Sequence, residues 1–185
     1  MARWSTRFIV LAVIWTASVS CSSHHGEAPA SAGLRAEGSA TMSQETTPRD
    51  LFDRWERVWH EGQYDLIPTC IGPTYIRHDE TGDRTVTLES YVAEIAKTRA
   101  DRPHLRFVVY DHTIEGSRAW FRFTLKWTDP KTGEPRTRAG MQVYRIEAGK
   151  LSETWLQFQP LGSAWTDAVA QEHWTSLPPI ASSNR

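Results

Sequence analysis

The first regular hydrophobic pattern along the chain has the spacing of an amphipathic helix. Five large apolar side chains fall on one helical face: Leu51, Phe52, Trp55, Val58 and Trp59. Thr47 can cap this helix, Pro48 stands at its first position, and Asp50 follows three residues after the cap. Gly62 is a typical helix terminator. The pattern therefore predicts a helix that begins after Thr47, ends at Gly62 and buries an aromatic face.

Shorter elements and a second helix are predicted next. Residues 66–71 predict a short turn or helix, Gly72-Pro73 breaks it, and residues 75–77 predict a short strand. Thr87 can cap the second helix, and Pro103 closes that segment. The apolar positions on its face are Leu88, Tyr91, Val92 and Ile95.

Four runs rich in β-branched and aromatic residues follow, and each predicts a strand. They cover residues 105–113, 118–128, 137–146 and 151–159. The segments between them contain Gly, Pro, Asp and Ser, which are the residues that turns favour. Helices followed by an antiparallel meander indicate an α+β fold, in which the N-terminal helices pack on one face of a curved antiparallel sheet.

The N-terminal 20 residues are predicted to be an export signal peptide. Arg3 and Arg7 precede an apolar run, residues 8–15, which is far shorter than a membrane span, and small residues follow it. Cys21 then stands where a bacterial lipoprotein carries its lipid. We expect an exported protein that is anchored to the membrane of the cell envelope through Cys21. Ordinary cleavage, which would give a secreted or periplasmic protein, is the alternative.

Composition divides the rest of the chain into three parts. Residues 21–46 contain few large apolar side chains and predict a disordered tether, because such a segment cannot offset the entropy of ordering. Residues 47–170 carry the regular patterns and form the predicted domain. Residues 171–185, which end in a Pro-containing polar stretch, are expected to form a flexible tail.

Charge and cysteine content exclude several classes of function. The formal net charge is −1, which argues against nucleic acid as a partner. Two cysteines cannot build a disulfide framework. His, Asp and Glu never recur at the spacing of metal ligands, so we expect no metal and no cofactor. The nine Trp residues instead suggest an interior lined with aromatic rings.

Two stretches carry a resemblance to a known family. The first is Leu105-Arg106-Phe107 followed by Glu115-Gly116-Ser117-Arg118-Ala119-Trp120, and the second runs from Val143 to Trp155 through a Gly-Lys turn and a Glu-x-Trp step. With the order of elements, they resemble the SnoaL-like branch of the nuclear-transport-factor-2-like superfamily over residues 48–165. The resemblance implies a cone-shaped α+β barrel with an apolar pocket. Family members include polyketide cyclases, isomerases, hydrolases and proteins without chemistry, so the fold does not fix the function.

The resemblance also implies where catalytic groups would lie. Cyclases of this family use an Asp on the last strand, a few residues after Glu-x-Trp. Here Glu153 and Trp155 match, but the Asp position falls on Gln159, whose neutral amide cannot take a proton. The remaining acid–base candidates are His78, with Asp79 to orient it, and Glu153. A solvated loop of charges is the alternative interpretation of residues 77–80.

The orientation of the last strand stays open at this point. Glu153, Trp155, Gln157 and Gln159 share one face, and Thr154, Leu156 and Phe158 share the other. The family likeness favours the first set as the pocket lining. The alternation of apolar residues favours the second set, which would make Glu153 a surface residue.

We expect the protein to bind a small hydrophobic molecule in the cone. The expected ligand-binding residues are Trp55, Trp59, Tyr75, Trp120, Trp155 and Gln159. The first alternative is a cofactor-free acid–base enzyme, an isomerase, hydrolase or cyclase, that works through His78, Asp79 or Glu153. The second alternative is a non-catalytic interaction module, including a homodimer formed through the sheet face.

Overall fold

The computed structural model describes residues 47–165 and 169–177. The expected signal peptide, Cys21 and the expected tether lie outside the described residues. Two main helices, α1 (Pro48–Glu61) and α3 (Leu88–Ala100), accompany the short η1 (Tyr64–Leu66) and α2 (Ile67–Cys70). Six strands follow the chain as β1 (Ile71–Asp79), β2 (Gly82–Thr87), β3 (Arg106–Glu115), β4 (Arg118–Thr128), β5 (Pro135–Glu147) and β6 (Lys150–Phe158). The expected α+β fold is confirmed.

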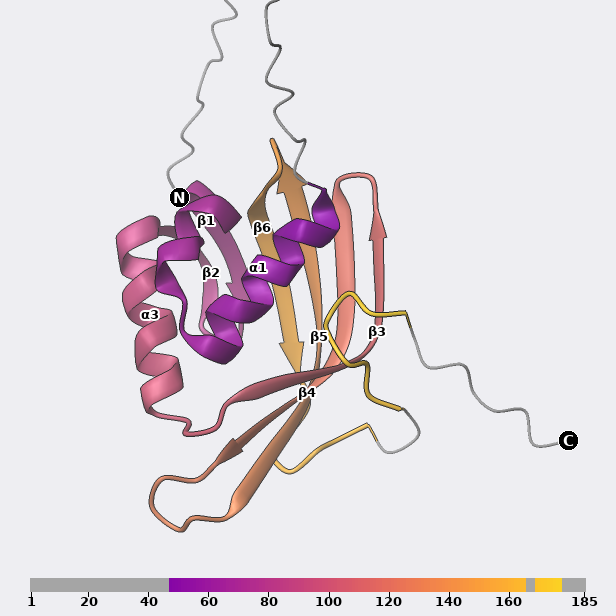
Figure 1. The fold of residues 1–185 in the computed structure, drawn as a ribbon. Coiled ribbons are helices and arrows are strands. Elements are labelled where there is room, and N and C mark those ends of the chain that lie inside the picture. Colours follow the sequence, from indigo (N-terminus) through magenta and orange to yellow (C-terminus); the bar gives the residue numbers. More distant parts are fainter. Residues whose placement is uncertain (1–46, 166–168, 178–185) are drawn as a thin grey trace, which may run out of the picture. The chain divides into compact units, whose positions relative to one another are not determined.

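The strands form one curved sheet in the order β2-β1-β6-β5-β4-β3. All neighbours are antiparallel except β1 and β6, which pair in parallel and set Ile76 opposite Glu153 and His78 opposite Trp155. The helix α1 lies across one face of the sheet, and α3 packs beside β1 and β2 (Figure 1). The meander of four strands is as predicted. The hairpin of β1 and β2 was not predicted, because residues 78–83 are polar and resemble a loop.

Local sequence signals fix the ends of both main helices. The Thr47 hydroxyl accepts from the Asp50 amide at 3.2 Å, and the Asp50 carboxylate accepts from the Thr47 amide at 3.0 Å. Gly62 ends α1 with φ +76°, which a residue with a Cβ adopts only under strain. Thr87 and Ser90 form the same reciprocal cap at the start of α3. The predicted boundaries of α1 are therefore confirmed.

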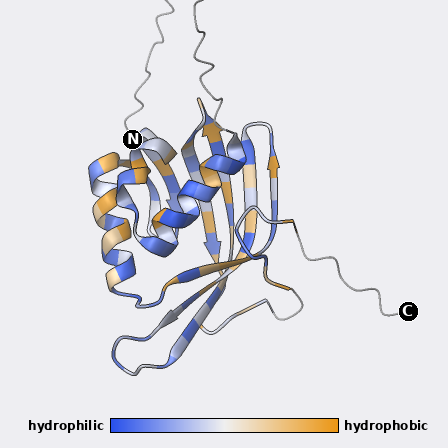
Figure 2. Cartoon of the chain, viewed as in Figure 1, coloured by the Kyte–Doolittle hydropathy of each residue, from blue (hydrophilic) through white to orange (hydrophobic). Residues whose placement is uncertain are grey.

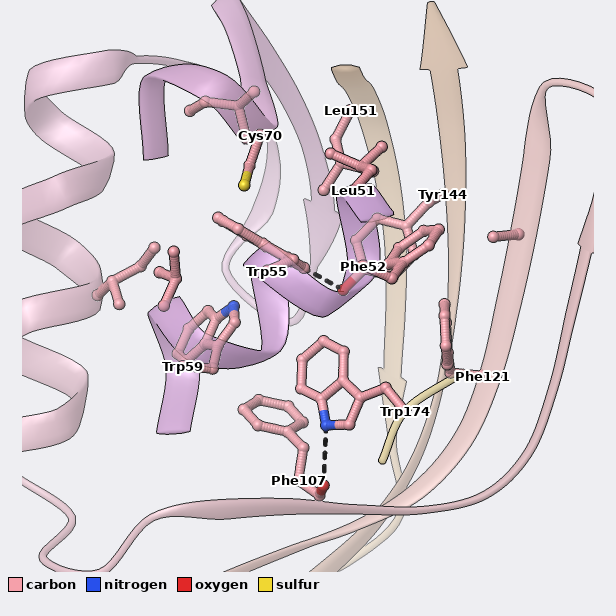
Figure 3. Close-up of a cluster of buried hydrophobic side chains, with 14 of the residues drawn as sticks. Leu51, Phe52, Trp55, Trp59, Cys70, Phe107, Phe121, Tyr144, Leu151 and Trp174 are labelled. Carbon is pink, nitrogen blue, oxygen red and sulfur yellow. Dashed lines mark hydrogen bonds between the residues drawn. The ribbon is translucent and has the colours of Figure 1, made fainter. Parts of the chain in front are cut away.

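The core lies between α1 and the sheet. The predicted helical face, which carries Leu51, Phe52, Trp55, Val58 and Trp59, is buried, and the aromatic rings of α1 meet those of Phe107, Phe121 and Tyr144 (Figure 3). Apolar and polar positions alternate along the strands (Figure 2), so one sheet face supplies the core and the other faces away from it. None of the described helices has the length and apolar character needed to cross a membrane.

The C-terminal segment corrects the expected domain boundary at residue 170. Trp174 is only 4% exposed, its indole N–H donates to the Phe107 carbonyl at 3.1 Å, and its amide donates to the Glu56 carboxylate at 3.0 Å. Gln171 and Thr175 are also buried. Residues 171–177 are therefore part of the domain, because an indole placed between α1 and β3 buries a large apolar area. Residues 178–185 lie outside the described residues.

Candidate functional site

The concave face of the sheet and α3 enclose a cavity of about 560 Å³. This volume lies within the range of about 300–1,000 Å³ that is typical of small-molecule pockets. Eight large apolar side chains from α1, the strands and the segments beside them line it: Trp59, Leu105, Phe107, Leu125, Trp127, Leu156, Phe158 and Leu161. The cavity can therefore accept an apolar body of moderate size.

A buried ion pair forms one polar wall of this pocket. Arg77, 5% exposed, donates from Nη2 and Nε to the Asp79 carboxylate at 2.8 and 3.1 Å, and its Nη1 contacts the Tyr91 hydroxyl. Partial burial acts to raise the pKa of Asp79, but hydrogen bonds from Thr81 and Arg77 outweigh it and lower that pKa. Asp79 is therefore ionised at neutral pH and is not poised to accept a proton.

The other two carboxylates of the pocket are also engaged by arginines. Glu94 accepts from Arg84 at 2.7 Å. Glu80 accepts from both terminal nitrogens of Arg138, at 2.6 and 2.8 Å. Among the residues described, the lining includes no histidine. The pocket is thus an apolar chamber with three arginine–carboxylate ion pairs. Because each of these carboxylates is bound to an arginine, none of them is free to act as a base.

Trp55 and Tyr75 lie behind the pocket wall, whereas Trp59 lines the pocket. Trp55 and Tyr75 are fully buried, and the Trp55 indole N–H donates to the Tyr144 hydroxyl at 3.4 Å (Figure 3). Burial raises the pKa of Tyr75 well above its usual value and that of Tyr91 to about 12. These phenols are neutral at physiological pH and belong to the packed base of the cone.

The structure separates His78 from Asp79. Successive residues of a strand point to opposite faces, so Asp79 enters the pocket and His78 lies on the outer face of the sheet. The His78 ring contacts Glu153 through Nε2 and Asp83 through Nδ1, both at 2.8 Å. The hypothesis that Asp79 orients His78 as a base in the pocket is therefore wrong. Hydrogen bonds to Glu153 and then Asp83 raise the pKa of His78.

Strand β6 presents Leu156 and Phe158 to the pocket, which resolves the open alternative in favour of the second set. Glu153 lies outside, where it also accepts from Arg145 at 2.8 Å. Trp155 stacks on His78 with ring centroids 5.1 Å apart. The interpretation of Trp155 as a pocket residue is therefore wrong, because the alternation of the strand turns its indole away.

Two further expected ligand-binding residues lie outside the pocket. Trp120 is 36% exposed and pairs in register with Val143 on the outer face. Gln159 is exposed just after β6, and its backbone carbonyl accepts from Arg138. Neither belongs to the lining. Of the six aromatic and amide residues expected to bind ligand, only Trp59 lines the cavity.

A second hollow of about 670 Å³ lies between α1 and residues 172–176. Charged and polar side chains make up its lining, including Arg57, His60, Arg106 and His173. An apolar ligand therefore favours the cone pocket. Within the described residues, no group of three or more His, Cys, Asp or Glu side chains could hold a metal ion.

The sequence reasoning missed several residues of the pocket. Leu156 and Phe158 could have been found from the alternation of apolar residues along the last strand. Arg77 and Arg102 carry no local signal, because their position in the pocket depends on how distant strands and α3 meet.

Comparison with known proteins agrees with this architecture. A family model described as SnoaL-like domain matches residues 52–154. A putative polyketide cyclase from Acidithiobacillus ferrooxidans is 21% identical, with a TM-score of 0.57 over 64% of this chain and 92% of that chain. IdmH, a putative polyketide cyclase from Streptomyces antibioticus, is 19% identical, with a TM-score of 0.55 over 61% and 92%. No curated protein matches the sequence significantly.

A third structure broadens the range of these relatives. A hypothetical protein from Catenulispora acidiphila, with a ketosteroid isomerase-like fold and in complex with trimethylamine, is 12% identical. It aligns with a TM-score of 0.52 over 60% of this chain and 86% of that chain. Similarity at these identities establishes the fold alone.

Proposed function

This chain belongs to the SnoaL-like domain family, and we propose that it binds a small hydrophobic molecule in the cone pocket. The observation that carries the proposal is the cavity of about 560 Å³ with eight large apolar side chains in its lining. Burial of apolar ligand surface there contributes roughly 25 cal/mol per Å² removed from water. The partly exposed Trp127 and Phe158 at this wall supply flat apolar surfaces.

The geometry favours binding over acid–base catalysis by the expected groups. His78 and Glu153 lie on the outer face, and Asp79 is held ionised by Arg77 and Thr81. A general base must reach the proton that it abstracts, at about 2.6–3.2 Å. A ligand inside the cone cannot approach His78 or Glu153 in this way, because the sheet separates them.

The test uses phenyl-naphthylamine, a neutral apolar dye that fluoresces when it leaves water. Thr98 lies on α3 and lines the pocket, so Thr98→Trp should fill part of the cavity and weaken dye binding at least tenfold. Trp155→Ala is the matched control on the outer face and should bind the dye as the wild type does. Equal dye affinity in the wild type and Thr98→Trp, with both folded by circular dichroism, would contradict the proposal.

Native mass spectrometry of protein purified from its own host provides a second test without a surrogate. We expect a co-purifying small molecule that organic extraction releases. If this molecule partitions into an apolar solvent, the result would support the proposed ligand class. A co-purifying molecule that stays in the aqueous phase would contradict it.

We also propose that the outer sheet face joins two copies of the chain. Ile76, Trp120 and Met141 are 40%, 36% and 46% exposed on that face, and exposed large apolar side chains are typical of interfaces. A two-fold axis places this face of one copy against the same face of the other, and both the acidic Asp83 and the basic Arg118 are exposed. Sedimentation should show a dimer that Trp120→Glu converts to a monomer; a monomeric wild type at micromolar concentration would exclude it.

The export proposal rests on the N-terminal sequence alone. We propose that residues 1–20 are removed and that Cys21 carries a lipid that holds the protein on the cell envelope membrane. Cys21→Ser should then move the protein from the membrane to the soluble fraction. Unchanged fractionation would contradict the anchor.

A further inference from the structure

We propose that the ligand of the cone pocket is an organic anion, with an apolar body and one carboxylate or phosphate group that Arg102 binds at the pocket mouth. This inference rests on the proposed function and specifies the ligand class. Arg102 follows α3 and lines the pocket together with Leu105 and Trp127. It is partly buried, so solvent screens its charge less than that of a fully exposed side chain.

Arg102 differs from the other arginines of the pocket in its partners. Arg77, Arg84 and Arg138 each form an ion pair with a carboxylate of the lining. Arg102 forms none with any residue that the structure describes, and Glu80 attracts it only from beyond ion-pair distance. Its guanidinium lies over the Trp127 ring, with Cζ 5.8 Å from the ring centroid. Stacking of this kind holds a guanidinium in place and leaves its N–H donors available.

A basic groove adjoins the pocket at this arginine. It has a volume of about 360 Å³, and the described residues that line it include no carboxylate: His60, Arg99, Arg102, His104, Leu105 and Arg106. Arg102 and Leu105 line both the groove and the pocket, so the two spaces meet there. The whole chain has a net charge of −1, and the concentration of positive charge is therefore local.

The other two arginines of the groove are anchored by backbone carbonyls. Arg99 donates to the Trp59 carbonyl, and Arg106 donates to the His60 carbonyl at 2.7 Å, both near the C-terminal end of α1. Neither forms an ion pair within the described part of the chain. These contacts fix both guanidinium groups beside Arg102 and leave their positive charge without a carboxylate partner.

The combined site matches a molecule with two chemically different ends. An apolar body fits between Leu105, Phe107 and Trp127, while an anion at the mouth meets Arg102 and the field of Arg99 and Arg106. A planar guanidinium binds a carboxylate or phosphate through two parallel hydrogen bonds. An anion placed there gives Arg102 a directly bonded partner of opposite charge, whereas a neutral ligand gives it none.

The experiment compares two dyes that share one apolar body. Anilinonaphthalene sulfonate carries an anionic group, and phenyl-naphthylamine lacks it. At low ionic strength the wild type should bind the sulfonate about tenfold more tightly than the neutral dye, as one charge-assisted contact predicts. Arg102→Gln should bring the affinities for the two dyes together, while Arg102→Lys should keep part of the preference for the sulfonate.

A control variant and three possible outcomes separate this inference from the pocket proposal on which it rests. Arg118→Gln removes the same charge from the exposed outer face and should leave both affinities unchanged. If the neutral dye binds but the sulfonate preference is absent or survives Arg102→Gln, the inference is wrong and the pocket proposal stands. If neither dye binds, the proposed function fails with it. A third outcome is that the protein binds anionic lipid vesicles in a way that requires Arg102 but shows no preference for the sulfonate dye. This result would assign the groove to a membrane surface and overturn the inference.

Discussion

The two faces of the sheet in this protein carry the same kinds of residue in opposite arrangements. On the inner face, apolar side chains and three ion pairs surround a cavity, and Arg102 in its lining forms no ion pair with any described carboxylate. On the outer face, His78 is held between Asp83 and Glu153, while Trp120 and Met141 are exposed. Both faces thus carry paired charges, but the inner face adds an apolar space and one arginine without an ion pair, whereas the outer face adds exposed apolar side chains.

This difference shows how much depends on a single step along a strand. Trp155 and Leu156 are neighbours in β6, yet the indole stacks on His78 outside and the leucine lines the pocket inside. The family likeness pointed to the tryptophan as a ligand contact. Strand alternation, which follows from backbone geometry, assigns that role to the leucine.

The largest expected effect separates two tryptophans on the two sides of the sheet. Trp55 is fully buried, so Trp55→Ala should lower the free energy of unfolding by about 3–5 kcal/mol through lost packing and a cavity. Trp120→Ala on the outer face should cost about 1 kcal/mol in the monomer, because its indole is partly exposed and leaves no closed cavity. Urea denaturation of both variants checks this contrast. Similar losses would mean that the outer face is also packed.

The second prediction concerns the C-terminal segment that covers the inner core. Trp174→Ala should cost about 3 kcal/mol of stability, because the indole is buried among Phe107, Phe121 and His60. Trp174→Phe should cost less, since it mainly removes the hydrogen bond to the Phe107 carbonyl, worth about 1 kcal/mol. Thermal unfolding measures both. If Trp174→Ala were as stable as the wild type, that result would support the expectation from sequence that this segment is a flexible tail.

A smaller effect is expected at Gly140, which is tightly packed on the inner face. A Cβ added at Gly140 would lie 2.8 Å from Phe123 Cζ and 3.0 Å from the Gln157 carbonyl oxygen. Gly140→Ala should therefore destabilise by about 1–3 kcal/mol, although alanine is ordinarily the better strand residue. Adding Phe158→Leu should recover part of the loss by removing a ring at 3.0 Å. A neutral or stabilising Gly140→Ala would show that the inner face has more room.

The smallest effect lies on the outer face and depends on pH. Hydrogen bonds to Glu153 and Asp83 raise the folded-state pKa of His78, so protonated His78 stabilises the fold. That contribution is fully present below the unfolded pKa, about 6.5, and is lost as the pH rises through the raised folded value. NMR titration of the imidazole should give a pKa above 6.5 that Glu153→Gln lowers. A wild-type pKa at or below 6.5 would contradict this account.

Local signals explain which parts of the fold the sequence predicted. The cap formed by Thr47 and Asp50 involves residues three positions apart, so the pattern places α1 correctly. The parallel contact of β1 with β6 joins His78 to Trp155, which no local pattern records. The burial of Trp174 could have been suspected, because a large aromatic side chain is unusual in a free tail.

The pocket was less predictable than the fold, because its lining comes from residues that are far apart in the sequence. Apolar alternation in β6 favoured Leu156 and Phe158, but family likeness favoured the opposite face. The loop of charges at residues 77–80 divides between the two faces: Arg77 and Asp79 enter the pocket, and His78 does not. The role of Arg102 depends on the meeting of α3, β3 and Trp127, and only the three-dimensional structure brings these together.

Methyl-resolved NMR during titration with phenyl-naphthylamine tests the central claim most directly, because both sheet faces carry methyl groups. Leu125 and Leu156 line the pocket, and Ile76 and Met141 lie on the outer face. The account predicts saturable shifts of the two leucine signals, with the Ile76 and Met141 signals unchanged. Shifts confined to Ile76 and Met141, with the leucine signals unmoved, would contradict it and make the outer face the binding surface.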